Sequence, residues 1–252
     1  DDIVVLDGRH KCIVHKEEDS NGNIVYKYLL SDTSSIKALA EALKVNRSLT
    51  TLNLKSNEIG VPDGWSIVHE SSGKFKHYKH TDGRTQRERP QGTSSGIVAL
   101  AKALEVNRAL KSANLSNNNI DTDGIRALCD ALKSNSTLES LIIRNNRYGA
   151  TKITAAGAQL IADMLVVNRS LKKLILGNNN IQDEGTAALS EALKSNNTLE
   201  TLELYENQIG VAGAQSLADM LQVNRALTSL DLYGNEIGAG GAEAIAAALP
   251  QS

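Results

Sequence analysis

The chain has 252 residues, of which 41% are hydrophobic and 22% are charged, and its formal net charge is -2. These values are typical of an ordinary globular protein that is long enough to bury a sizeable core. Its two cysteines, Cys12 and Cys129, are too few for a disulfide-rich secreted scaffold. No apolar run approaches the roughly 18 residues that a membrane-spanning helix needs. We therefore expect a cytoplasmic protein with no membrane partner.

The charge is distributed unevenly along the chain. Residues 182–252 contain ten acidic and two basic residues, a net charge of -8, so residues 1–181 carry +6. Such an asymmetry indicates a partner, or two partners, recognised partly by charge. A chance gradient over solvated surfaces remains the alternative.

Residues 1–33 contain short strand patterns. Val4–Leu6 is expected to form one strand, and Lys11–His15 and Ile24–Leu29 a hairpin around the Asn-Gly turn signal within Ser20–Asn23. This segment is either a divergent β insertion or a cap that shields the first of the repeat units found after residue 33.

A nine-residue pattern, first seen at Leu49–Asn57, recurs along the rest of the chain. The intervals between its closing asparagines are 61, 28, 33, 28 and 28 residues, so the period is 28 with one long and one short insertion. The recurrences are Leu110–Asn118, Leu138–Asn146, Leu171–Asn179, Leu199–Asn207 and Leu227–Asn235.

Each 28-residue unit has two halves with different periodicity. Leu202 and Leu204 alternate with polar residues, which predicts a short strand, whereas Leu189 and Leu193 lie four apart, as on one face of a helix. An asparagine follows each helical pattern and is expected to adopt a left-handed helix-ending turn. These residues are Asn46, Asn107, Asn135, Asn168, Asn196 and Asn224.

At these residues the sequence resembles the ribonuclease-inhibitor class of leucine-rich repeats, like those of nucleotide-binding innate-immune receptors. The resemblance covers residues 34–60 and 93–252. It implies an α/β solenoid, a horseshoe with a parallel β-sheet on its concave face and helices on its convex face. It also implies that the closing asparagines form a ladder of bonds to neighbouring loops.

Residues 61–92 interrupt the repeats and contain the only Trp and the only Phe of the chain. Turn signals predict three short strands here, and the segment resembles a WW domain, a module that binds proline-rich peptides. The resemblance implies that Pro62, Trp65 and Pro90 stabilise the module. The residues at the groove positions are not the aromatic ones that stack on proline; they are Lys76, His77 and Arg87.

No catalytic or cofactor motif is visible in the sequence. It lacks a phosphate-binding loop, a G-x-S-x-G elbow and an H-E-x-x-H pair. Strand alternation separates His77 from His80, which argues against a metal site. A net charge of +2 in the insert is thin support for nucleic-acid binding. We therefore predict a protein that is not an enzyme and has no cofactor, metal or nucleic-acid partner.

The strand residues that point away from the core are the predicted binding surface for a protein partner. We expect an exposed apolar patch of Ile142 and Ile175, and two tyrosines stacked one repeat apart with acidic neighbours. The residues chosen are Asn53, Lys55, Ile142, Arg144, Lys173, Ile175, Glu203, Tyr205, Glu206, Asp231 and Tyr233. Two alternatives stay open: an adaptor that binds proline-rich or phosphorylated peptides through the WW-like insert, and a regulator of a small GTPase.

Overall fold

The computed structural model describes ten parts of the chain, and the described residues that lie within 2–34 and 66–78 are described by their backbone alone. The described residues are 2–5, 11–18, 24–29, 33–57, 59, 61–63, 65–69, 75–86, 95–144 and 153–249.

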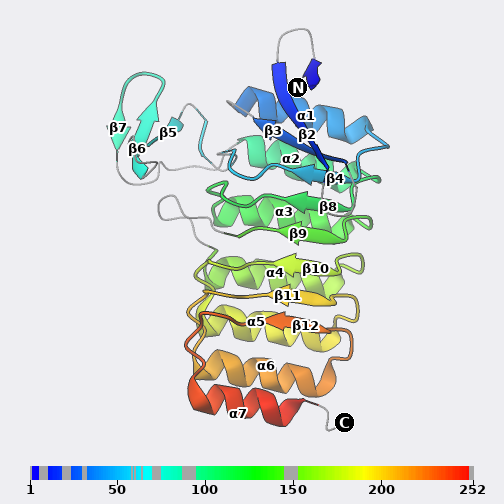
Figure 1. Cartoon of the computed structure of the whole chain (residues 1–252), viewed down its shortest axis with the longest axis vertical. Coiled ribbons are helices and arrows are strands. Elements are labelled where there is room, and N and C mark those ends of the chain that lie inside the picture. Colours follow the sequence, from blue (N-terminus) through cyan, green and yellow to red (C-terminus); the bar gives the residue numbers. More distant parts are fainter. Residues whose placement is uncertain are drawn as a thin grey trace.

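In the described residues, the main sheet has nine strands in the order β1-β2-β3-β4-β8-β9-β10-β11-β12 (Figure 1). The first three pair antiparallel, and every later neighbour pairs parallel. The bounds are β1 Asp2–Val5, β2 Lys11–Glu18, β3 Ile24–Leu29, β4 Thr51–Asn53, β8 Ser112–Asn114, β9 Ser140–Ile142, β10 Lys173–Ile175, β11 Thr201–Glu203 and β12 Ser229–Asp231.

The parts of the chain that the structure describes include seven helices, which stack in a second layer along one side of this sheet (Figure 1). They are α1 Thr33–Val45, α2 Ser95–Val106, α3 Thr122–Ser134, α4 Ala155–Val167, α5 Gln182–Ser195, α6 Val211–Val223 and α7 Gly238–Ala248. We call the opposite side of strands β4 to β12 the sheet face. None of the helices in the described residues is both long and apolar enough to cross a membrane.

The predicted periodicity places the core between the two layers. Leu202 and Leu204 point inward from the β11 unit, and Leu189 and Leu193 point inward from α5; all four are fully buried. Glycines allow the helices to approach each other, because a Cβ at Gly185 would lie 2.8 Å from the Cβ of Ala158. The α/β repeat fold with its parallel sheet, predicted from the sequence, is therefore confirmed.

The asparagines that close the strand pattern link each unit to its neighbour. The Asn118 side chain accepts the Asn57 N–H at 2.8 Å through Oδ1 and donates to the Leu54 carbonyl at 2.7 Å. Asn235 makes the same two kinds of bond to the β11 unit. This ladder agrees with the expectation from the family resemblance, and it satisfies backbone groups that the irregular loops leave unpaired.

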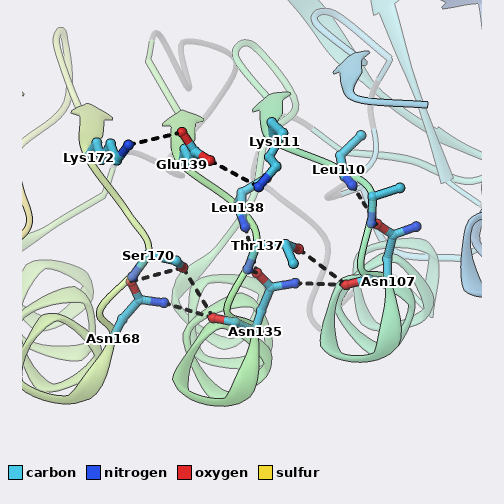
Figure 2. Close-up of polar contacts among 11 residues, drawn as sticks. Asn107, Leu110, Lys111, Asn135, Thr137, Leu138, Glu139, Asn168, Ser170 and Lys172 are labelled. Atoms are coloured by element: carbon cyan, nitrogen blue, oxygen red, sulfur yellow. Dashed lines mark hydrogen bonds and ion pairs between the residues drawn. The ribbon is translucent and has the colours of Figure 1, made fainter. Parts of the chain in front are cut away.

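A second asparagine ladder runs along the helix ends, where the left-handed prediction was wrong (Figure 2). Asn135 has φ -72° and ψ 126°, which is extended backbone. Its Nδ2 donates to the Leu104 carbonyl at 2.6 Å and its Oδ1 accepts the Leu138 N–H at 2.8 Å. The side chain itself makes the turn, so the backbone has no need of a left-handed conformation. Asn168, Asn196 and Asn224 do the same.

The insert between β4 and α2 projects from the side of the stack (Figure 1). It is a small antiparallel sheet made chiefly by β5 (Trp65–His69) and β6 (Phe75–His80), to which the two-residue strand β7 (Thr85–Gln86) is added. Asp63 attaches the start of the insert to α2, because it accepts both the N–H and the hydroxyl proton of Ser95, at 3.1 and 2.5 Å. The Lys37 ammonium lies 3.8 Å from the same carboxylate.

Next to β4, at the start of the row of parallel strands, β2 and β3 form the hairpin that the sequence predicted. Its last strand, β3, pairs parallel with β4 through Tyr26–Leu52 and Lys27–Asn53. The segment therefore extends the main sheet on the side away from the later repeats.

Candidate functional site

The parallel register places equivalent residues of successive units in rows across the sheet face. One row contains Ile142, Ile175, Glu203 and Asp231, which are direct partners on neighbouring strands. The row two residues further along contains Arg144, Gly177, Tyr205 and Tyr233. The sheet face thus passes from basic and apolar residues on β9 and β10 to acidic residues on β11 and β12.

Tyr205 lies across the neighbouring unit and is held there from two sides. Its ring covers Gly177, and any Cβ added at this glycine would overlap the ring atoms. Its hydroxyl accepts a hydrogen bond from Nη1 of Arg144 at 3.2 Å. Arg144 belongs to the β9 unit, so the contacts of Tyr205 connect the units of β9, β10 and β11. The tyrosine is half-buried, and its ring lies flat on the sheet face.

The expected apolar patch is only partly present. Ile142 is half-buried, but Ile175 is 6% exposed, so the prediction that both isoleucines are exposed was wrong. Strand alternation reports only the face to which the side chain of Ile175 points. Its exposure depends also on the side chains of neighbouring units, which strand periodicity does not report.

Tyr233 occupies the same repeat position as Tyr205 but is 77% exposed. The two rings do not stack as predicted: among the described residues the only aromatic ring pair in contact is Trp65 with His80. The reason is that Tyr205 leans toward Arg144, away from Tyr233. The Tyr233 N–H is held by Oδ1 of Asp231 at 2.9 Å, which fixes its backbone but leaves its ring free for a partner.

The acidic residues around the tyrosines differ in their contacts. Glu203 is half-buried and lies 3.5 Å from Nζ of Lys173, so each neutralises part of the other's charge. Glu206 is exposed, and its carboxylate accepts a bond from Asn178 at 2.5 Å. Glu206 has φ +52°, a left-handed conformation at the bend that follows the strand.

A row of alternating charges lies where the strands begin (Figure 2). Glu139 is 3.0 Å from Nζ of Lys111 and 3.4 Å from Nζ of Lys172. Hydrogen bonds from Lys111 first, and then from Lys172, hold the pKa of the Glu139 carboxyl below its usual value. This row was not predicted from the sequence, although alignment of the units places Lys111, Glu139, Lys172 and Glu200 at one repeat position.

The remaining predicted residues lie further from the tyrosines. Asn53 and Lys55 belong to the β4 unit, which is separated from β9 by β8. Asn53 is half-buried and its Oδ1 accepts the N–H of exposed Lys55 at 3.1 Å, so it shapes the local turn. The structure therefore brings together the residues from Ile142 to Tyr233 and leaves these two apart. Gly177 is the residue that sequence reasoning missed within that group.

The insert contains a separate polar and aromatic cluster. The Trp65 and His80 rings meet edge to face with centroids 5.0 Å apart, and the Arg84 guanidinium lies 5.8 Å from the Trp65 ring. Asp82 bonds to both His80 Nδ1 and Arg84 Nε at 2.8 Å. The Arg84 backbone N–H is the main cause that lowers the pKa of Asp82.

The residues that the WW resemblance singles out are only partly described. Pro62 is buried and accepts the Trp65 N–H at 3.1 Å. Lys76 and His77 lie in β6, while Arg87 and Pro90 fall outside the described residues.

No arrangement suited to catalysis emerges in the parts of the chain that the structure describes. They contain no group of three or more His, Cys, Asp or Glu residues that could hold a metal ion. Cys129 is buried in the core, and burial raises the pKa of its thiol to about 12. Such a thiol stays protonated and is a poor nucleophile.

Comparison with known families identifies the repeats. Five stretches match the family model described as Leucine Rich repeat: residues 45–64, 106–129, 167–190, 195–218 and 223–246. The chain therefore contains leucine-rich repeats, as the sequence analysis expected. No curated protein sequence matches the chain.

Two of the solved structures that are similar to this chain are described by their titles. One, titled "Leiomodin-1 Actin-Binding Site 2 (ABS2)", is 25% identical with a TM-score of 0.51, over 61% of this chain and 85% of that chain. The other is the tropomodulin C-terminal domain of Caenorhabditis elegans, 16% identical with a TM-score of 0.51, over 62% of this chain and 90% of that chain. The second likeness concerns the fold alone.

Proposed function

We propose that the chain is a non-catalytic scaffold that binds a protein partner on the sheet face, between β9 and β12. The observation that carries the proposal is the pair of tyrosines, which occupy the same repeat position but differ in exposure and contacts. The Tyr205 ring packs on Gly177, whereas Tyr233 is 77% exposed next to Asp231. Tyrosines with a polar rim are favoured at protein interfaces, because a large ring is immobilised at low entropy cost.

Charge indicates the chemistry of the partner. Glu206 and Glu236 are exposed near Tyr233, and Asp231 is half-buried. The electrostatic potential around the tyrosines is therefore negative on the side that a partner would approach. A Lys- or Arg-containing segment fits this surface, since its cations pair with the carboxylates and pack on the rings. At the β9 end, Arg144 favours an acidic or carbonyl group of the same partner.

The similar structure of leiomodin-1 is, by its title, an actin-binding site. A protein of related architecture thus binds a protein partner, and actin is the first defined partner to test. The experiment is co-sedimentation with filamentous actin, followed by affinity capture from cell extract with identification of the bound protein.

Both assays compare the unchanged chain with the double variant Asp231→Asn, Tyr233→Ala. Asn at position 231 still accepts the Tyr233 N–H, so the backbone of the unit is preserved. Val223→Ala is the matched control, because Val223 is 56% exposed at the end of α6, in the helix layer. We expect the double variant to lose its partner and the control to keep it. Retention by both would refute a site on the sheet face.

A second candidate function is that of a peptide adaptor acting through the insert. In that case residues 61–92 form an independent WW-like module between the solenoid segments 34–60 and 93–252. Residues 1–33 are then an N-terminal β element. The Trp65 cluster and the Asp63 attachment support it, because the first packs the small sheet and the second bonds its start to α2. Replacing residues 65–86 by a short Gly-Ser linker keeps buried Val61 and Pro62, and it keeps Asp63, which makes the attachment. Loss of the partner with this variant alone would assign recognition, including that of proline-rich or phosphorylated peptides, to the insert.

A further inference from the structure

The acceptor pattern for N-linked glycans, Asn-x-Ser/Thr, occurs five times along the repeats. Three of its asparagines belong to the helix-end ladder: Asn135, Asn168 and Asn196, whose exposed fractions are 4%, 2% and 0%. The other two, Asn46 and Asn114, are half-buried. In the folded chain the three ladder asparagines are therefore closed to an enzyme that attaches glycans.

The atom that carries an N-linked glycan, Nδ2, is fully engaged in each of these three side chains. In Asn135 it donates to the Leu104 and Asn107 carbonyls, at 2.6 and 3.3 Å (Figure 2). Asn168 and Asn196 make the same pair of bonds to the unit before each, at 2.7 and 3.2 Å and at 2.8 and 3.3 Å. An amide nitrogen that carries a sugar keeps a single hydrogen, so a glycan removes at least one bond of each pair and leaves a buried carbonyl unpaired.

From these observations we infer that Asn135, Asn168 and Asn196 accept an N-linked glycan only while the chain is unfolded, and that a glycan there prevents folding. In the transfer, Nδ2 forms a bond to the first sugar of a lipid-linked oligosaccharide and gives up one proton. The bond between that sugar and the lipid diphosphate breaks, and the diphosphate leaves. The product is bulky and polar, whereas the folded chain packs these side chains between two units. Folding and glycosylation therefore compete for the same amide groups.

The ladder does not depend on the Ser or Thr that completes each acceptor pattern. The α2 unit has Ala109 at this position, and its N–H donates to Asn107 Oδ1 at 2.9 Å. The Thr137 N–H makes the same bond to Asn135 Oδ1, also at 2.9 Å. The Thr137 hydroxyl adds one long bond, 3.4 Å to the Asn107 carbonyl. Alanine can therefore remove an acceptor pattern and keep the bonds that the asparagine makes.

One glycan is expected to be enough to block folding. Each ladder asparagine links two consecutive units, and a solenoid is stabilised by contacts between neighbouring units. A chain with these acceptor patterns thus reaches its folded state only where it does not meet the lipid-linked oligosaccharide. The inference concerns the compartment in which the protein folds, and it does not depend on the partner proposed for the sheet face.

The test directs the full chain into microsomes during cell-free translation, by means of an added secretory signal sequence. A background variant lacks all five acceptor patterns. Each replacement is a residue that another unit has at the same position, as Ala109 and Asp231 show. The changes are Ser48→Ala, Asn114→Asp, Thr137→Ala, Ser170→Ala and Thr198→Ala. Circular dichroism of this variant, made without the signal sequence, verifies that it folds.

Two derivatives of the background each contain one acceptor. The first retains Thr137, so that Asn135 alone accepts a glycan. The second, Ser134→Asn, is the matched control: it creates the pattern Asn-Asn-Ser one residue earlier, at a position that is exposed at the end of α3. Endoglycosidase sensitivity identifies the glycosylated molecules, and their resistance to added protease after opening the microsomes reports folding.

We expect both derivatives to be glycosylated. The protease-resistant fraction of the glycosylated Asn135 derivative should be at least about tenfold lower than that of the glycosylated control, because a buried site cannot hold the glycan. Equal resistance of the two would overturn the inference. So would the absence of a glycan at Asn135, since the unfolded chain then accepts none. The variants leave the sheet face from β9 to β12 unchanged, so this inference and the proposed function can fail separately.

Discussion

The Arg144 guanidinium donates a hydrogen bond to the Tyr205 hydroxyl at 3.2 Å, although one whole unit separates the two residues. The contact crosses Gly177, where a side chain would otherwise stand between them. A glycine on the sheet face thus decides the orientation of the aromatic ring that we assign to partner binding.

Substituting Gly177 by Ala should displace the Tyr205 ring rather than the backbone, because the atoms that a Cβ meets belong to a movable side chain. We expect loss of the Arg144 bond and a decrease of about 1 kcal/mol in the free energy of unfolding. NMR of the Tyr205 ring and chemical denaturation measure the two effects.

Gly240→Ala serves as its control. Gly240 is exposed in α7, and the nearest atom to an added Cβ is Val211 Cγ1 at 3.7 Å. Here the substitution should stabilise the protein by about 0.5–1 kcal/mol, since a helix favours alanine over glycine. If both substitutions changed the free energy of unfolding in the same direction, the role assigned to Gly177 would be contradicted.

Removing one asparagine of the helix-end ladder should lower the free energy of unfolding more than Gly177→Ala does. Asn168 is 2% exposed; its Nδ2 donates to the Leu132 carbonyl at 2.7 Å, and its Oδ1 accepts the Leu171 N–H at 2.9 Å. Asn168→Ala leaves both backbone groups buried and unpaired, so we expect a loss of about 2–4 kcal/mol in unfolding free energy. Exposed Asn197 provides the comparison, and Asn197→Ala should change stability by less than about 0.5 kcal/mol. Similar losses of unfolding free energy in both variants would contradict a structural role for the ladder.

The Glu139 carboxyl should titrate below the usual glutamate range, because Lys111 and Lys172 stabilise its charged form. A lowered folded pKa means that this stabilisation is present above the unfolded pKa and is lost as the pH falls through the folded one. NMR titration of the side chain measures the value directly. Lys111→Met should raise it toward normal, whereas Lys133→Met, on α3 beside Asp130, should leave it unchanged. A pKa insensitive to Lys111 would be inconsistent with the row of charges.

The Cys129 thiol should resist alkylation in the folded protein, since burial raises its pKa to about 12 from an ordinary 9.0. With Cys12 replaced by Ser, labelling at mildly alkaline pH reports Cys129 alone and should accelerate sharply on unfolding. The raised pKa also means that this residue's contribution to stability declines as the pH rises above about 9, where the unfolded thiol ionises. Rapid labelling of the native protein would show that the thiol is accessible.

The sequence by itself determined the repeating architecture. Leucines at strand spacing and at helix spacing, returning every 28 residues, admit one economical arrangement, in which each unit buries its apolar side against the next. The closing asparagines, the hairpin near the start and the position of the insert were all predictable from the same local patterns.

Only the tertiary structure decided how side chains of different units meet. Ile175 alternates like an exposed residue but is buried, and Tyr205 shares its repeat position with Tyr233 yet lies in a different environment. The helix-end asparagines were placed correctly but given the wrong backbone, because their side chains bond to the preceding unit. Periodicity reports the direction in which a side chain leaves the backbone. Its burial and its partners depend on neighbours 28 to 61 residues away, which are set only when the units stack.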